Sequence, residues 1–152
     1  MHLQQQQVTG QDRHDTLIQA RLVDDNHRGT FLPDMFGTPL FMRGEGLVFA
    51  WMRQLVRDYH GGVWMFYTLD NGGFYLAPKA KEPFVLSVAG NGYVGEMSAD
   101  AAGIVATLFA LCQLNHEWVD TDQGDRLADR YHALLAFAAE HAEAGAILSA
   151  ID

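Results

Sequence analysis

Hydrophobic residues at helical spacing mark an amphipathic helix in the first half of the chain. They recur every three or four positions along residues 43–59, which places them on one face of a helix. These residues are Leu47, Val48, Trp51, Met52, Leu55, Val56 and Tyr59. Before this helix, residues 17–23 predict a short edge strand, and the turn-forming residues and prolines of residues 24–39 predict an irregular connection.

Four short hydrophobic segments in the middle of the chain predict two β-hairpins. Residues 63–69 are continuously aromatic and aliphatic, and residues 74–77 follow them after an Asp-Asn-Gly-Gly turn. Residues 84–88 and 93–97 flank a Gly-Asn-Gly turn in the same way. Asn and Gly tolerate the positive φ angles that tight hairpin turns require. Together the hairpins predict one small antiparallel sheet of about four strands.

The second half of the chain predicts helices that pack with this sheet. Ser98 is a good N-cap for a helix that runs to about His116 and is apolar on nearly every side. Such a helix must be surrounded by other elements, so we expect it at the centre of the core. Residues 125–140 predict an amphipathic helix, and residues 143–151 a last short one. Strands that cluster between helices predict an α+β fold.

Composition is that of an ordinary globular protein. The chain has 152 residues, of which 49% are hydrophobic and 19% charged. This size predicts a single domain over residues 17–152, and a flexible polar tail is expected over residues 1–16. With one cysteine, Cys112, the chain can form no internal disulfide, and its start does not resemble an export signal. The longest uncharged stretch, residues 101–116, is shorter than the roughly 18 apolar residues that cross a bilayer. We therefore expect a cytoplasmic protein without a membrane anchor.

The charge balance argues against direct nucleic acid binding. The chain carries 10 Lys and Arg against 19 Asp and Glu, a net charge of -9. Negative charge disfavours attraction to phosphates, although carboxylates can also mimic DNA. The longest acidic concentration, residues 120–129, is brief and is interrupted by Arg126. The sequence therefore shows no ladder of charge comparable to that of DNA.

Residues Gly90 to Gly95 match the G-x-G-x-x-G pattern of dinucleotide-binding proteins. In those proteins the helix begins within the glycines, so that its N-terminal amides meet the pyrophosphate. Here Tyr93 and Val94 favour a strand, and the helix cap comes only at Ser98. A structural hairpin is the better interpretation.

His116-Glu117 begins like the zinc motif H-E-x-x-H, but the second histidine is absent. Cys112 is expected to be buried on the central helix, where a thiol is a poor nucleophile. We therefore predict no catalytic residue, no cofactor and no metal site. The alternative is a small nucleotide- or metal-binding enzyme that uses the Gly90–Gly95 loop and the His116 region.

Two other features are candidates for contact with a partner. Arg53 and Arg57 are expected one turn apart on the polar side of the first helix, where they could bind carboxylates or phosphates. Asp152 adds a carboxylate just after the last helix, where negative charge opposes the helix dipole. Because stability does not explain that choice, Asp152 is a further candidate.

Long segments of the chain resemble the ArdB/KlcA antirestriction family. They read FLPDMFG at residues 31–37, AWMRQLVRDYHGGVWMFYTLDNGGFYLAP at 50–78, EMSADAAGIVATLFAL at 96–111 and LADRYHALLAFAAEHAEAGAILSAID at 127–152. These segments stand in the family's order and span nearly everything after about residue 20. Strings of this length are far more specific than any short catalytic motif.

The resemblance implies a compact α+β protein, carried by plasmids or other mobile elements, that protects incoming DNA from type I restriction-modification complexes. It implies no catalytic residues, and it separates this group from the strongly acidic DNA mimics that share its role. Our hypothesis is direct binding to the restriction complex through exposed acids such as Asp122, Asp125 and Asp129. Strict DNA mimicry is the competing mechanism. It would inhibit modification as well as restriction, and salt would weaken it steeply.

Overall fold

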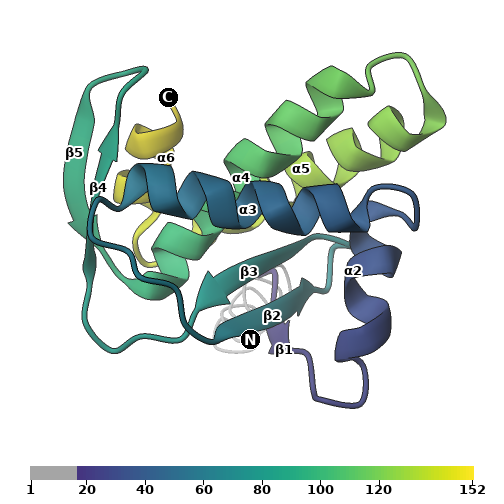
Figure 1. The fold of residues 1–152 in the computed structure, drawn as a ribbon, viewed down its shortest axis with the longest axis horizontal. Coiled ribbons are helices and arrows are strands. Elements are labelled where there is room, and N and C mark those ends of the chain that lie inside the picture. Colours follow the sequence, from purple (N-terminus) through teal and green to yellow (C-terminus); the bar gives the residue numbers. More distant parts are fainter. Residues whose placement is uncertain (1–16) are drawn as a thin grey trace, which may run out of the picture.

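The structure, a computed structural model, describes residues 17–152, so the tail predicted over residues 1–16 lies outside the described residues. Figure 1 shows α3 and α4 in the middle of the molecule, with the hairpin of β4 and β5 at the left and the β1-β2-β3 sheet below them. The elements are β1 (Ala20–Leu22), α2 (Arg28–Phe36), α3 (Phe41–Leu55), β2 (Trp64–Leu69), β3 (Phe74–Pro78), β4 (Phe84–Val88), β5 (Tyr93–Met97), α4 (Ala99–Glu117), α5 (Asp122–Glu140) and α6 (Ala144–Ile151). The predicted α+β class and both hairpins are confirmed.

The strands form two separate antiparallel sheets, so the prediction of one sheet was wrong. One sheet has the order β1-β2-β3, and the other consists of β4 and β5. The outer edge of β3 is already occupied by α4, because the backbone N–H of Leu76 donates to Thr107 Oγ1 (3.2 Å). The hydroxyl therefore takes the place of a strand partner at Leu76, in the middle of this edge.

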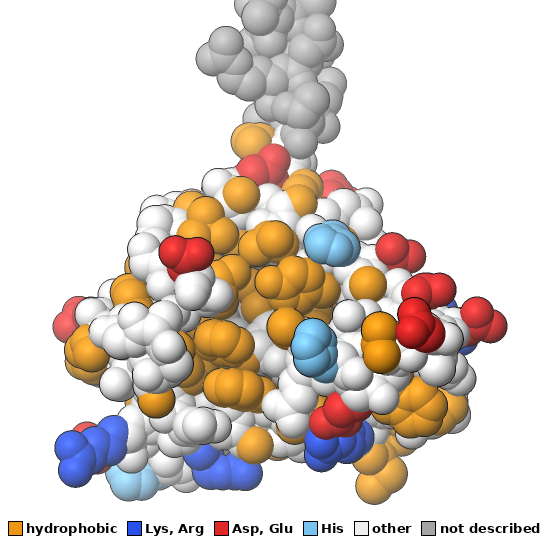
Figure 2. Space-filling view, turned by 90° about the horizontal axis from the view of Figure 1, so that it is seen from above, with side chains coloured by type: hydrophobic (Ala, Val, Ile, Leu, Met, Phe, Trp, Pro, Cys, Tyr) orange, Lys and Arg blue, Asp and Glu red, His pale blue; other side chains and the backbone are white. Residues whose placement is uncertain are grey.

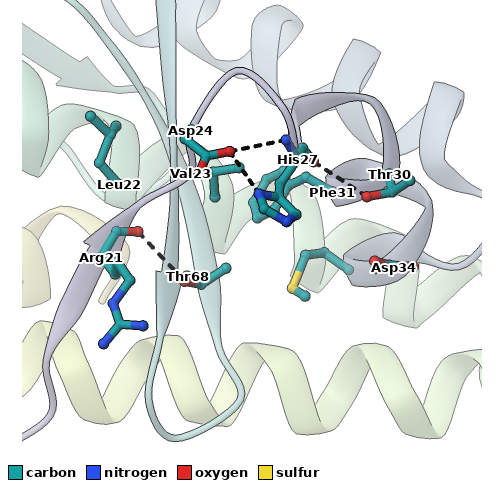
Figure 3. A pocket seen from close by; sticks show the side chains of 10 residues that line it. Arg21, Leu22, Val23, Asp24, His27, Thr30, Phe31, Asp34 and Thr68 are labelled. Atoms are coloured by element: carbon teal, nitrogen blue, oxygen red, sulfur yellow. Dashed lines mark hydrogen bonds and ion pairs between the residues drawn. The ribbon is translucent and has the colours of Figure 1, made fainter.

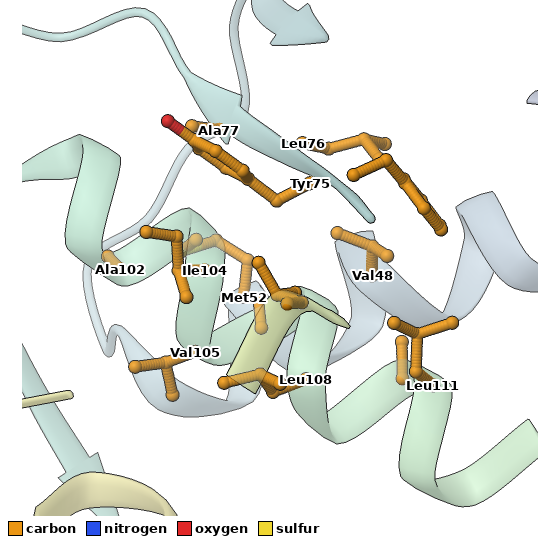
Figure 4. Close-up of a cluster of buried hydrophobic side chains, with 14 of the residues drawn as sticks. Val48, Met52, Tyr75, Leu76, Ala77, Ala102, Ile104, Val105, Leu108 and Leu111 are labelled. Carbon is orange, nitrogen blue, oxygen red and sulfur yellow. The ribbon is translucent and has the colours of Figure 1, made fainter. Parts of the chain in front are cut away.

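Helix α4 lies at the centre of the core, as predicted. Twelve of its 19 residues are buried, and it packs against α3, α5, α6 and β3. Figure 4 shows its Ile104, Leu108 and Leu111 facing Val48 and Met52 of α3. Such burial from every side explains why its sequence lacks a polar face.

The absence of a side chain at Gly103 lets α4 approach β3 closely. A Cβ added there would lie 2.5 Å from the Cα of Ala77, closer than real contacts allow. The Thr107 hydroxyl, one turn later, donates to the Gly103 carbonyl (2.8 Å). The small residue and the hydroxyl together fix how helix and strand pack.

Helix α2 was not predicted, because Gly29 and Pro33 both disfavour helix interiors. The helix is instead held by its tertiary contacts. Phe31 stacks on Phe66 with ring centroids 5.0 Å apart, and the Arg28 guanidinium lies 4.1 Å from the centre of the same ring. Aromatic burial and a cation–π contact therefore override local propensity.

Helix α3 ends at Leu55, four residues earlier than the hydrophobic spacing suggested. Val56 follows the helix in an extended conformation (φ -114°, ψ 106°), and its side chain is nevertheless buried. Tyr59 accepts a hydrogen bond from the Trp64 indole N–H (2.7 Å). Both side chains therefore reach the core without helical backbone.

No helix within residues 17–152 combines the length and the apolar character needed to span a membrane.

Candidate interaction surfaces

The Gly90–Gly95 segment belongs to the hairpin of β4 and β5, as predicted: its first three residues form the turn and the rest begins β5. Gly92 has a φ of 75°, and the Asn91 side-chain oxygen accepts the backbone N–H of Tyr93 (2.9 Å). The Asn91 amide group donates to the carbonyls of Ala150 (3.0 Å) and Asp152 (3.3 Å). Helix α4 begins only at Ala99, beyond the strand. The turn caps the end of α6 and lacks the geometry of a dinucleotide fingerprint.

Glu117, the acid of the incomplete zinc motif, forms an ion pair with Arg43. The Arg43 Nε donates to Glu117 Oε1 (3.0 Å), and this guanidinium is the main reason that the Glu117 pKa lies below its usual range. His116 is exposed at the end of α4, which fits the solvated helix end that was expected. Within residues 17–152, no three His, Cys, Asp or Glu side chains lie close enough to hold one metal ion.

Cys112 is exposed, so the prediction that it is buried was wrong. It lies on the outer face of α4, three residues after half-buried Phe109 and four residues before exposed His116. The prediction failed because α4 is apolar on nearly every side, so its sequence does not show which narrow face is exposed.

The acidic face of α5 consists of Asp122, Asp125 and Asp129. Their spacing of three and four residues places them along one side of the helix, and all three are exposed. Asp122 and Asp125 lie in the first turn, where carboxylates favour the positive end of the helix dipole. Among residues 17–152, the salt bridges involve other groups. These acids are therefore free to meet a partner.

Arg53 and Arg57 line one groove of about 500 Å³, which we call the arginine groove. The prediction that they share one helix was wrong, because α3 ends before Arg57. The groove also includes Trp51, Gln54, Leu55, Ser87, Val88, Ala89, Gly90 and Phe109. The structure thus brings the two arginines together across the end of α3.

Asp152 is exposed at the end of α6. Its backbone carbonyl accepts the Asn91 amide, and the preceding Gly90 lines the arginine groove. The C-terminal segment therefore adjoins the turn that forms one wall of the groove. The acidic face lies on α5, which contributes no lining residue to it.

A part-buried polar network, with no local signal in the sequence, joins β3, α4 and the turn between α5 and α6. The Tyr75 hydroxyl donates to Asp100 Oδ1 (2.8 Å), and His141 Nε2 lies 2.8 Å from Asp100 Oδ2. His141 Nδ1 accepts the backbone N–H of Glu143 (2.9 Å), which assigns the ring proton to Nε2. Burial, with Asp100 second, raises the pKa of Tyr75 well above its usual value.

A second hollow, of about 370 Å³, lies between β1 and α2 (Figure 3). His27 Nδ1 lies 2.7 Å from Asp24 Oδ1, and the hydrogen bond from His27 lowers the pKa of Asp24. Both side chains are largely exposed, so solvent screens the pair. His27 and Asp24 are already paired with each other, whereas Arg53 and Arg57 of the arginine groove form no salt bridge within the described residues.

Comparison with known proteins identifies the family. A family model described as "Antirestriction protein" matches residues 57–152.

The chain belongs to the antirestriction protein family.

Relatives in Escherichia coli extend the match beyond the segment covered by the family model. The chain is 56% identical over 138 residues to an antirestriction protein KlcA, covering 91% of this chain and 97% of the relative. It is 33% identical over 138 residues to the putative antirestriction protein YubI, covering 86% and 93%. The resemblance found in the sequence is thereby confirmed.

A solved structure of this antirestriction family has the same fold. It superposes with a TM-score of 0.83 at 56% identity, covering 89% of this chain and 95% of that one. It belongs to work on the KlcA and ArdB proteins that describes a novel fold and antirestriction activity against Type I DNA restriction systems in vivo but not in vitro.

Proposed function

We propose that this antirestriction protein inhibits type I restriction systems in the cytoplasm and so protects incoming plasmid or mobile-element DNA. The observation that carries the proposal is the 56% identity, over 89% of the chain, to a structure from the KlcA and ArdB work, which describes activity against Type I systems. The inhibition would act by contact with the restriction complex and would hinder cleavage or the DNA translocation before it.

A non-enzymatic mechanism is supported by the roles of the polar residues that resemble catalytic ones. Ser98 caps α4 by accepting the Ala101 N–H (3.1 Å). His141 and Asp100 bind each other inside the polar network. The Gly90–Gly95 segment turns a hairpin. Each group has a structural partner, so no catalysis is needed to account for it.

The acidic face supports contact with a protein over strict DNA mimicry. Asp122 and Asp129 are seven residues apart, which is about 10 Å along a helix. Over that length B-DNA displays roughly six charges, at one per about 1.7 Å. The acidic face displays three, with Arg126 and Arg130 on the same helix. This density is too low to replace a DNA backbone.

The direct test is restriction in living cells, since the activity described for the KlcA and ArdB proteins was seen in vivo. Unmodified phage is plated on cells that carry a type I system, with and without this chain. The proposal predicts that plating rises with the chain while modification of the phage DNA continues. Unchanged plating at confirmed expression would refute it, and a matching loss of modification would favour DNA mimicry.

The contribution of the acidic face is tested by reversing its charges with Asp122→Lys, Asp125→Lys and Asp129→Lys. A matched control reverses three exposed acids on other elements, Asp25, Glu82 and Glu96, with the same change in net charge. The first variant should lose protection and the control should keep it. Protection that survives in a folded first variant would remove these acids from the mechanism.

A further inference from the structure

The arginine groove has a rigid apolar floor. Trp51 stacks on Phe109 with ring centroids 4.6 Å apart and planes 17° from parallel. The Trp51 indole N–H donates to Gln113 Oε1 (3.1 Å), and Gln113 Nε2 donates in turn to Glu117 Oε2 (3.3 Å). A floor held in this way needs little ordering when it binds, which favours affinity.

The floor is only half covered by the protein itself. Trp51 and Phe109 are half-buried, whereas Leu55 and Val88 beneath them are buried. The volume of about 500 Å³ lies within the usual range for ligand sites, roughly 300–1,000 Å³. The groove can therefore accept one or two hydrophobic side chains.

Positive charge lines this groove in a protein that is acidic as a whole. Arg53 and Arg57 are exposed, and neither takes part in a salt bridge within residues 17–152. Arg43, by contrast, is neutralised by Glu117. Two unpaired guanidinium groups beside an aromatic floor complement a partner that carries carboxylates.

Further half-buried or exposed apolar side chains lie on α4 and α5 outside the groove. Phe109 and Cys112 lie three residues apart on one face of α4, and half-buried Tyr131 belongs to α5, the helix that packs against α4. Figure 2 shows hydrophobic side chains gathered across the middle of the face seen from above, with Lys and Arg along its lower margin.

We infer that the arginine groove is a docking site for an acidic segment of another protein. The segment places a hydrophobic side chain on Trp51 and Phe109 and sets carboxylates against Arg53 and Arg57. This inference goes beyond the proposed function, because it defines the chemistry of the segment whichever protein supplies it.

The test is an NMR titration of the isotope-labelled full chain with two peptides of opposite charge. One is acetyl-Asp-Leu-Asp-Phe-Asp-amide, and the other is its lysine counterpart, acetyl-Lys-Leu-Lys-Phe-Lys-amide. The acidic peptide should shift the amide signals of residues 87–90 and the Trp51 indole signal in a saturable way. The basic peptide should leave those signals in place.

Three variants identify the groups responsible. Arg53→Gln with Arg57→Gln should weaken binding of the acidic peptide about tenfold, as expected for the loss of two exposed ion pairs. The matched control, Lys79→Gln with Lys81→Gln, removes the same charge from exposed positions outside the groove and should change binding less than about twofold. Ala89→Trp fills the groove without changing charge and should abolish the shifts.

Equal shifts with both peptides, no shifts at the groove, or full affinity in the arginine variant would overturn the inference. So would a dimer of the free protein that Ala89→Trp converts to a monomer, because a second copy would then be the occupant. Protection from restriction is not the readout. The peptide titration can therefore refute the docking site while the proposed function stands, and the restriction assay can refute the proposed function while the docking site stands.

Discussion

Helices α4 and α5 are both 19 residues long and lie side by side, yet α4 is mostly buried and α5 is mostly exposed. Twelve residues of α4 are buried, against four of α5. Two polar side chains of α4 bind other elements of the fold: Thr107 binds β3, and Asn115 Nδ2 donates to the Gly124 carbonyl (2.6 Å). The acids of α5 point to solvent. The difference separates residues that build the fold from residues that remain available for a partner.

The largest loss of stability is expected from a substitution at the contact between α4 and β3. Gly103→Ala places a Cβ 2.5 Å from the Cα of Ala77, so helix and strand must move apart. Overpacking of this kind should lower the free energy of unfolding by about 3 kcal/mol, measured by urea denaturation. Gly46→Ala is the control, because Gly46 is exposed in α3 with no atom within 4 Å of an added Cβ. It should raise stability by about 0.5–1 kcal/mol. Equal effects at both sites would refute the close contact.

The second largest loss of stability is expected from removal of the Thr107 hydroxyl, which accepts the backbone N–H of Leu76 in β3. Thr107→Val keeps the side-chain shape but leaves the buried Leu76 N–H without an acceptor. An unsatisfied buried donor should cost about 2 kcal/mol. Thr107→Ser, which retains the hydroxyl, should lose less, and amide hydrogen exchange at Leu76 should speed up only in the valine variant. Unchanged exchange there would show that Thr107 does not hold this edge.

The third prediction concerns the pH dependence of stability and rests on Tyr75. Its hydroxyl donates to Asp100 of α4, and its ring stacks on Phe137 of α5 with ring centroids 5.7 Å apart. Its folded pKa is raised by burial, above an unfolded value near 10. The folded protein keeps this proton where the unfolded chain has released it, so stability falls as the pH rises above about 10.

Tyr75→Phe should cost about 1 kcal/mol at neutral pH through the lost hydrogen bond. Above pH 10 it should remove a decline of about 1.4 kcal/mol per pH unit. Urea denaturation between pH 7 and about pH 11 measures both quantities. Parallel pH profiles for the variant and the original chain would contradict this role of Tyr75.

The smallest effect on stability is expected on the acidic face. Replacing Asp122, Asp125 and Asp129 together by Asn removes favourable interactions with the helix dipole and should cost no more than about 1 kcal/mol. Protection from restriction should nevertheless fall. A loss of stability as large as that of Gly103→Ala would erase the distinction between the two helices.

The sequence predicted those elements whose local pattern agrees with their tertiary surroundings. The hairpin strands and the Ser98 cap follow from local turn and capping chemistry, and the structure has them where they were expected. Helix α2 was missed because its stability comes from aromatic contacts with strands more than 30 residues away. The separation of the two sheets was missed because α4 packs along β3, and the contact between Thr107 and Leu76 joins residues 31 positions apart.

The surface residues were harder to predict than the fold. The three acids were expected to be exposed, but the predicted helix began at Asp125 and so left out Asp122. Spacing alone put Arg57 on a helix that ends at Leu55. The groove between the arginines and residues 87–90 depends on how α3 meets the second sheet. The pairing of His141 with Asp100 joins residues 41 positions apart and leaves no local signal.

Capture of the restriction complex inside cells tests the central claim most directly. Tagged chain is cross-linked in restricting cells before lysis, and the type I subunits recovered with it are quantified. The account predicts recovery with the original chain and with the Lys79→Gln, Lys81→Gln control, and strongly reduced recovery with the Asn variant of the acidic face. Full protection without any recovered subunit, or equal recovery with the Asn variant, would contradict it.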